Sequence, residues 1–302
     1  MKRDPSRKLD PERMLALAKT RKRQDRRVVS YLIAGAIMVL CLGGISWFLW
    51  PEDPPRFNLA AYDAVAVPDE SIKLFASIRA EGNDRSAAIK GLAMRFQVTA
   101  TQKDETQFTD SAGSAAIEWR APKDKNAVVE FMVRHQSAEN PRHAIRNQGR
   151  VFIWPADSNL LVVDVDHALT EGIEGLAGNT APKLRSGAVE SLRRLSQKYN
   201  IAYLCTGTTD PGTYKKLRSW LQLQTPSGPL IGNPAASDMF IGVQIRQFSN
   251  QFTRPGVVVV GRSEEAQLAI DAGWKAIIIG GGPPVGSAAI AVQSWTELVK
   301  EL

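Results

Sequence analysis

The chain has 302 residues, of which 44% are apolar and 23% charged, so it can bury a sizeable core. This composition excludes disorder, collagen and coiled coil as descriptions of the whole chain. The net charge of +7 lies entirely in residues 1–27, which hold 11 Lys/Arg and 4 Asp/Glu. The rest of the chain is balanced in charge, and a duplex-binding domain needs a basic face, so we expect no nucleic-acid partner.

Residues 28–50 (VVSYLIAGAIMVLCLGGISWFLW) carry no charged side chain over 23 residues. As a helix this stretch would span about 35 Å, enough to cross a bilayer. Basic residues precede it, and Glu52 and Asp53 follow it. The positive-inside rule therefore predicts one transmembrane signal anchor, with the tail 1–27 cytoplasmic and residues 51–302 on the non-cytoplasmic side. A cleaved signal peptide and a buried core helix are the alternatives, but the apolar run is long for a signal peptide.

After a stiff polar linker at 51–58, residues 59–157 contain short runs with partial period-two alternation, separated by turn residues. This pattern predicts a β-sandwich. The segment Thr109 to Ala115, followed by Trp119, resembles the TD-x-x-G-x-A turn and strand of bacterial Ig-like domains. A hairpin turn without functional content explains the same residues. We interpret this part as a spacer or as an interaction module for a protein partner.

Residues 158–302 alternate between apolar strands and amphipathic helices. Strands are predicted at 160–163, 201–205, 257–260 and 276–279, and helices at 182–198, 211–223, 264–272 and 287–301. Repeated βα units predict an open, mostly parallel sheet with helices on both faces and a ligand site at the carboxyl ends of its strands. The predicted fold class is therefore α/β, preceded by an Ig-like β-sandwich and one transmembrane helix.

Polar residues follow three of these strands directly. Asp164 and Asp166 come after the first strand, Thr206 and Gly207 after the second, and 261–265 (GRSEE) after the third. Two carboxylates at one strand end can divide the work of a nucleophile and a general acid/base. The three histidines have no His or Cys partner at ligand spacing, so no zinc site is predicted.

Residues 160–302 resemble the haloacid dehalogenase (HAD) superfamily of phosphohydrolases. The segment 164–169 (DVDHAL) is similar to the first motif of that family, 204–207 (LCTG) to the second, and 261–273 (GRSEEAQLAIDAG) to the fourth. The resemblance implies that Asp164 forms an aspartyl-phosphate, that Asp166 is the acid/base, and that Thr206 and Gly207 bind the phosphoryl group. It also implies Mg²⁺ held by Asp164, the main-chain carbonyl of Asp166 and an acid of the fourth motif.

The resemblance is incomplete at two motifs. The lysine of the third motif is absent from 232–256, and Arg262 stands where the fourth motif has its first Asp. Glu265, or less favourably Glu264, would then supply the remaining metal ligand, and Arg262 could bind the phosphoryl group in place of the lysine. An ordinary charged helix start explains 262–265 equally.

Two functions therefore remain open at this point. One is a membrane-anchored, Mg²⁺-dependent phosphatase, and the other is an inactive HAD-like pseudoenzyme that serves as a binding or scaffolding ectodomain. Residues 220–234 (WLQLQTPSGPLIGNP) faintly resemble the capless domain of lipin-type and Nir proteins. An open site of that kind favours a lipid or protein phosphate as substrate.

Overall fold

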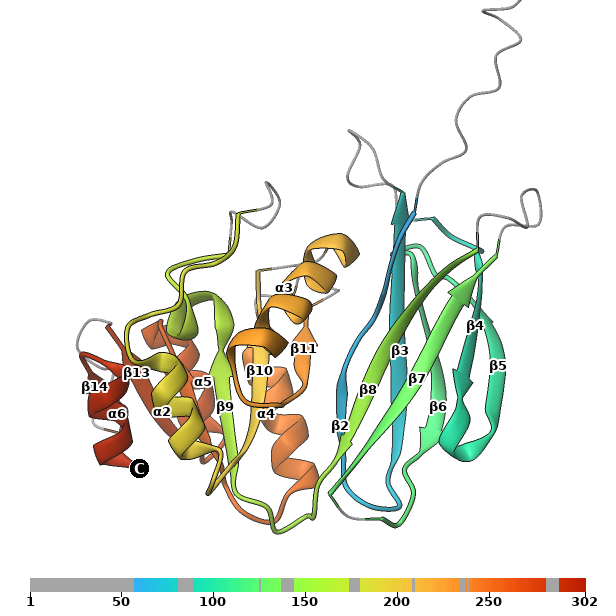
Figure 1. Cartoon of the computed structure of the whole chain (residues 1–302). Coiled ribbons are helices and arrows are strands. Elements are labelled where there is room, and N and C mark those ends of the chain that lie inside the picture. The colour runs from blue at the N-terminus through green and yellow to red at the C-terminus, as the bar shows by residue number, and fades with distance from the viewer. Residues whose placement is uncertain are drawn as a thin grey trace, which may run out of the picture. The chain divides into compact units, whose positions relative to one another are not determined.

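The computed structural model describes residues 57–80, 89–124, 126–136, 144–173, 180–207, 210–233, 237, 239–280 and 288–302 (Figure 1). The chain divides into two compact units, Met1–Pro54 and Pro55–Leu302, and all described residues belong to the second.

The predicted transmembrane helix at 28–50 lies outside the described residues. Within the described ranges no helix is long and apolar enough to cross a bilayer, and the longest, α3, has 14 residues. The predicted fold class is corrected on this point, because its membrane-spanning element has no counterpart among these helices. The prediction of a single-pass membrane protein, with residues 51–302 on the non-cytoplasmic side, is corrected for the same reason.

Residues 57–153 form two β-sheets around one core. A three-stranded antiparallel sheet has the order β1-β3-β6, and a five-stranded sheet has the order β2-β8-β7-β4-β5, in which only β2 and β8 are parallel. The strands are β1 Phe57–Ala61, β2 Ala64–Ala66, β3 Ser71–Ala80, β4 Ala93–Val98, β5 Lys103–Phe108, β6 Ser114–Arg120, β7 Ala127–His135 and β8 Ile145–Ile153, with the 3-10 turn η1 at Thr99–Thr101. Alternate side chains of β3, β4 and β7 point into the shared core, which includes Leu74, Phe96 and Val133.

Residues 160–292 contain a six-stranded parallel sheet with the order β11-β10-β9-β12-β13-β14. Its strands are β9 Leu160–Asp164, β10 Asn200–Cys205, β11 Leu230–Gly232, β12 Val257–Val260, β13 Lys275–Ile279 and β14 Ile290–Val292. β9 is buried along its whole length, because Leu161 and Val163 pack in one core cluster while Leu160 and Val162 pack in another. A strand buried on both faces needs a continuous apolar run.

Helices cover both faces of this sheet (Figure 1). Helices α2, α3 and α6 contribute to the core cluster on one face, and α4 and α5 to the cluster on the other. Their bounds are α2 Ala188–Leu195, α3 Pro211–Gln224, α4 Phe240–Gln251, α5 Ser263–Asp271 and α6 Trp295–Glu301. A five-residue π-helical turn, η2 Val165–Leu169, follows β9 directly.

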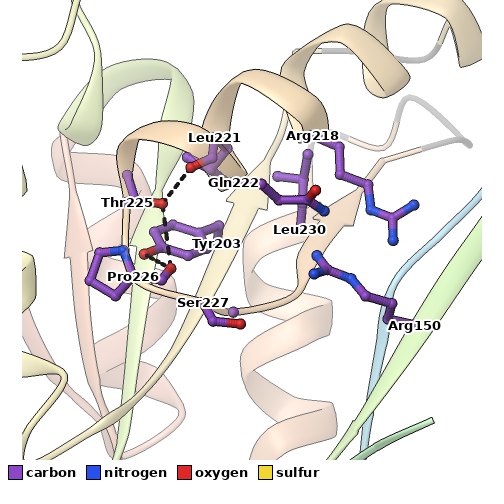
Figure 2. A pocket seen from close by; sticks show the side chains of 10 residues that line it. Arg150, Tyr203, Arg218, Leu221, Gln222, Thr225, Pro226, Ser227 and Leu230 are labelled. Carbon is purple, nitrogen blue, oxygen red and sulfur yellow. Dashed lines mark hydrogen bonds between the residues drawn. The ribbon is translucent and has the colours of Figure 1, made fainter. Parts of the chain in front are cut away.

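The sandwich and the parallel sheet are joined by the carboxylate of Asp63, whose side chain is fully buried. It accepts hydrogen bonds from the backbone N–H and guanidinium of Arg150 on β8, from the guanidinium of Arg218 on α3, and from the N–H of Leu230 on β11. The Tyr214 hydroxyl accepts from the Asp63 N–H and donates to the Leu230 carbonyl. Figure 2 shows the two arginines on facing sides of a pocket of about 150 Å³.

Candidate functional site

The site begins where β9 ends. Asp164 is the last residue of β9 and is 1% exposed. Its two carboxylate oxygens accept hydrogen bonds from the N–H groups of Asp166 (3.0 Å) and His167 (3.1 Å), so Asp164 caps the η2 turn. Each carboxylate oxygen keeps further acceptor capacity.

Asp166 faces the end of the neighbouring strand β10. Its Oδ2 accepts three hydrogen bonds, from the N–H (2.8 Å) and hydroxyl (2.7 Å) of Thr206 and from the N–H of Gly207 (2.5 Å). Its Oδ1 lies 3.3 Å from the thiol of Cys205, which donates to it. Burial raises the pKa of Asp166, and the negative charge of Asp164 raises it further, while the bonds from Thr206 and Gly207 oppose this.

The end of β12 supplies a third set of charges. The Arg262 guanidinium donates twice to Oε1 of Glu265 on α5, from Nε at 2.9 Å and from Nη2. The Glu265 side chain is only 9% exposed, and its Oε2 is buried without a hydrogen-bond partner. Burial and the nearby charge of Asp164 raise the pKa of Glu265 to about 7, although Arg262 acts in the opposite direction.

Asp164, His167 and Glu265 form a candidate metal-ligand group, in which one ligand atom from each lies within 4.8 Å of the other two. The His167 Nδ1 lies 3.3 Å from Oδ2 of Asp164, and this interaction raises the pKa of His167. Mg²⁺ prefers oxygen ligands, which Asp164 and Glu265 offer, so the two carboxylates fit this ion. The imidazole nitrogen of His167 adds a ligand that is better suited to zinc or iron.

Close packing fixes the η2 turn in place. A Cβ added to Gly261 would lie 2.4 Å from the carbonyl oxygen of His167, so only glycine fits between the end of β12 and this turn. The Arg185 guanidinium donates to the carbonyls of His167 (3.0 Å) and Thr170 (3.2 Å). These contacts hold the backbone that carries both aspartates.

The structure brings the residues singled out in the sequence to one edge of the sheet. Asp164, Asp166, Thr206, Gly207, Arg262 and Glu265 lie at the carboxyl ends of β9, β10 and β12 or directly after them. The side chain of Asp166 points toward Thr206 and Gly207 and is not part of the three-residue ligand group. Glu264 is exposed.

Sequence reasoning did not include three residues of this region. They are His167, Arg185 and Asn233, whose amide donates to the Thr206 carbonyl at 3.2 Å. For His167 the signal was its position three residues after Asp164, which places it on the same turn. No sequence signal indicated Arg185.

No family model matches the chain, and no curated protein matches it. Among solved structures, D,D-heptose 1.7-bisphosphate phosphatase from B. bronchiseptica, crystallised with magnesium and phosphate, is similar at 12% identity and a TM-score of 0.38, covering 47% of this chain and 97% of that chain. A defluorinating L-2-haloacid dehalogenase is similar at 16% identity and a TM-score of 0.32, covering 40% of this chain and 54% of that chain. The structural neighbours thus include phosphatase and dehalogenase folds of the HAD superfamily, at low identity and over part of the chain.

The predicted Ig-like character of residues 59–157 is not supported by these comparisons. The IG1 domain of Dpr1, bound to DIP-eta IG1, is similar at 12% identity with a TM-score of 0.22, covering 34% of this chain and 98% of that chain. This part of the chain consists of two β-sheets around one core.

Proposed function

We propose that this chain is a divalent-cation-dependent hydrolase of phosphoric esters that acts through an aspartyl-phosphate on Asp164. The observation that carries the proposal is the charge around Asp164. Its carboxylate is fully buried beside a second buried carboxylate, Glu265, which has one oxygen without a partner. Buried like charges are costly unless positive charge compensates them, so Asp164 and Glu265 would hold a divalent cation, which would supply positive charge for phosphoryl transfer.

The two aspartates have different environments and would take different roles. Asp164 would attack phosphorus through one carboxylate oxygen, and the bond from phosphorus to the ester oxygen would break. Asp166, whose pKa is raised by burial, would donate its proton to the departing oxygen. It would then accept a proton from the water that attacks the aspartyl-phosphate, which returns Asp164 to its carboxylate form and releases phosphate.

The remaining residues would stabilise charge on the phosphoryl group. The N–H groups of Thr206 and Gly207 and the Thr206 hydroxyl converge at one point and can donate to a phosphoryl oxygen. Arg262 is 49% exposed on its side chain and can turn from Glu265 toward an incoming phosphate. Asp164 and Glu265 would hold Mg²⁺, which neutralises negative charge when it is bound.

A binding function without catalysis is the second candidate, and one observation favours it. All three donors from Thr206 and Gly207 are bonded to Asp166, and Arg262 is bonded to Glu265. A phosphoryl group would have to displace these contacts. A pseudoenzyme could retain them as a permanent structural network.

Hydrolysis of p-nitrophenyl phosphate by the purified full-length chain, with Mg²⁺, Mn²⁺ or Zn²⁺ added, distinguishes the two candidates. We expect turnover, and a ³²P-labelled phosphoryl group on the protein after incubation with a labelled aryl phosphate and quenching in cold acid. Asp164→Asn should abolish both signals, while Asp157→Asn, which changes an exposed carboxylate ahead of β9, should leave them unchanged. Absence of turnover and of labelling with all three ions would favour the binding function.

A further inference from the structure

A cavity of about 730 Å³ lies between the sandwich and the helix α4, and it is much larger than the pockets beside Arg150 and Arg218. One wall comes from residues 62–75 of the sandwich, and the other from β11 and α4. Cavities that bind small molecules usually have about 300 to 1,000 Å³, so this one is large enough for a ligand of several rings.

The cavity adjoins the candidate active site through Asn233. This side chain is 3% exposed and lines the cavity, and its amide donates to the carbonyl of Thr206, the residue that bonds to Asp166. β11 lies two strands from β9 in the sheet, which corresponds to about 10 Å. A substrate with its phosphate at Asp164 could therefore reach the cavity with the rest of its length.

The α4 wall of the cavity carries carboxamides beside the apolar side chains of Phe240, Val243 and Phe248. Gln244, Gln247 and Gln251 follow one another at spacings of three and four residues, so they share one face of α4. Gln251 donates through Nε2 to Glu70 at 2.9 Å, while its Oε1 is buried without a hydrogen-bond partner. That oxygen can accept a hydrogen bond from a ligand, and Asn250 also lines the cavity.

The other wall is apolar and partly aromatic. Its lining includes Tyr62, Val65, Ile72 and Phe75. The ring centroids of Tyr62 and Phe75 lie 5.7 Å apart. The charged side chains in the lining are Asp63, Glu70 and Lys73. Asp63 is paired with two arginines and Glu70 is bonded to Gln251, so the cavity offers no excess of positive charge.

This lining matches a neutral ligand rich in hydroxyl groups. A nucleotide or another polyanion would need several cations, and Lys73 is the only cationic side chain among the described residues of the lining. An acyl chain would remove the glutamine amides from water without replacing their hydrogen bonds, which is costly. Hydroxyl groups both donate and accept, as carboxamides do, and the C–H faces of sugar rings are apolar enough to pack on the opposite wall.

We propose that this cavity binds the neutral saccharide portion of a phosphorylated carbohydrate. That the saccharide belongs to the substrate rests on the proposed hydrolase function. The binding of a neutral saccharide rests only on the lining of the cavity.

The test is a titration of the full-length chain, labelled with ¹⁵N in its glutamine and asparagine side chains, with maltotriose, cellotriose and chitotriose. We expect at least one of these probes to shift the side-chain amide signals of Gln244, Gln247 and Gln251. The signal of Gln222, which lines the pocket beside Arg218, should stay in place. Gln247→Leu should weaken binding about tenfold, as expected for the loss of a ligand hydrogen bond, and the matched variant Gln222→Leu should not weaken it.

Three outcomes would overturn the inference. The first is that no probe at millimolar concentration moves the α4 glutamine signals, and the second is that dodecyl lysolipid moves them while the saccharides do not. The third is an equal loss of affinity in Gln247→Leu and Gln222→Leu. Thermal unfolding of both variants shows whether they are folded.

The outcome is independent of the proposed hydrolase function. Asp164→Asn should retain saccharide binding, because Asp164 does not line the cavity. Saccharide binding without p-nitrophenyl phosphate turnover would leave the cavity assignment standing and remove the hydrolase. Turnover without saccharide binding would do the reverse.

Discussion

Glu265 should make the stability of the metal-free protein depend on pH. Burial and the charge of Asp164 raise its pKa from an ordinary 4.5 to about 7. Each pKa unit corresponds to about 1.4 kcal/mol, so the ionised carboxylate should destabilise the folded state by about 3 kcal/mol. The side chain is 9% exposed, so solvent screening reduces this value little.

The sign follows from the order in which the two states lose the proton. Below the unfolded pKa of 4.5, Glu265 is protonated in both states and has no effect on the difference between them. As the pH rises toward about 7, the unfolded chain releases its proton first, and the folded state loses stability. Above about pH 7 the full cost is present, because Glu265 is ionised in both states.

Urea unfolding in EDTA at about pH 5 and about pH 8 measures this effect in the natural chain and in Glu265→Gln. The variant should gain about 2.5 kcal/mol relative to the natural chain between the two pH values, because its amide cannot ionise and the unfolded carboxyl of the natural chain is already partly ionised at about pH 5. Other titrating groups contribute to both proteins and cancel in the difference. Glu264→Gln, on the exposed side of the same helix turn, is the control and should show no such gain.

A relative gain below about 1 kcal/mol would refute this account of Glu265. The same proteins also test the metal site. At about pH 8 an added divalent cation should raise the unfolding temperature of the natural chain, since it binds only the folded state, and should raise that of Glu265→Gln less. Equal stabilisation of both proteins would show that Glu265 is not a ligand.

Three further changes test other parts of the structure. Asp63→Ala should lower the free energy of unfolding by about 3 to 5 kcal/mol in urea, because it leaves two largely buried arginines unpaired, whereas Asp104→Ala, in an exposed ion pair, should have little effect. Gly261→Ala should lower the unfolding temperature and any turnover together, because the new Cβ would overlap the turn after β9, while Gly242→Ala has room at 3.4 Å and should be tolerated. His167→Asn should weaken Zn²⁺ binding more than Mg²⁺ binding in calorimetry, since it removes the nitrogen ligand, and equal weakening of both would argue against ligation by His167.

The long buried strands could be predicted from the sequence, and the short elements could not. β9, β10, β12 and β13 lie where continuous apolar runs predicted strands, because burial on both faces leaves a clear pattern. β11 and β14 have three residues each, too few to show a period. α4, which begins without a side-chain cap, was also not predicted.

Two helix boundaries were placed too early, for identifiable reasons. The helix predicted from 182 begins at Ala188, because Gly187 has a left-handed φ of 76° and the chain is irregular before it. The helix predicted from 287 begins at Trp295, after the strand β14. The Ser294 hydroxyl accepts there from the Glu297 N–H, and the Glu297 carboxylate accepts from the Gln293 N–H. The Ser-x-x-Glu spacing that marks this helix start was available in the sequence.

The candidate site could be located from strand ends, but its internal contacts could not. Parallel strands bring their carboxyl ends to one edge, so Asp164, Thr206 and Arg262 were expected near one another. The sequence could not show that the Asp166 carboxylate accepts hydrogen bonds from the Thr206 and Gly207 donors that follow β10. It also could not show that Asn233 connects this edge of the sheet to a cavity. Those features depend on side-chain directions that are fixed by packing.

The contacts of Asp166 link substrate binding to acid/base chemistry in this site. In the structure its Oδ2 holds three donors, and these bonds favour its charged form, whereas burial and Asp164 favour the neutral form. A phosphoryl oxygen that takes over those donors would remove the bonds that favour ionisation. The pKa of Asp166 would then rise, and it would carry the proton that the leaving group needs at the moment when the phosphate is bound. The network around Asp166 is therefore compatible with catalysis only if the donors can exchange partners. Thr206→Val distinguishes the enzyme from the pseudoenzyme. In an enzyme it removes a donor that the phosphate needs, whereas in a pseudoenzyme it removes only a structural hydrogen bond.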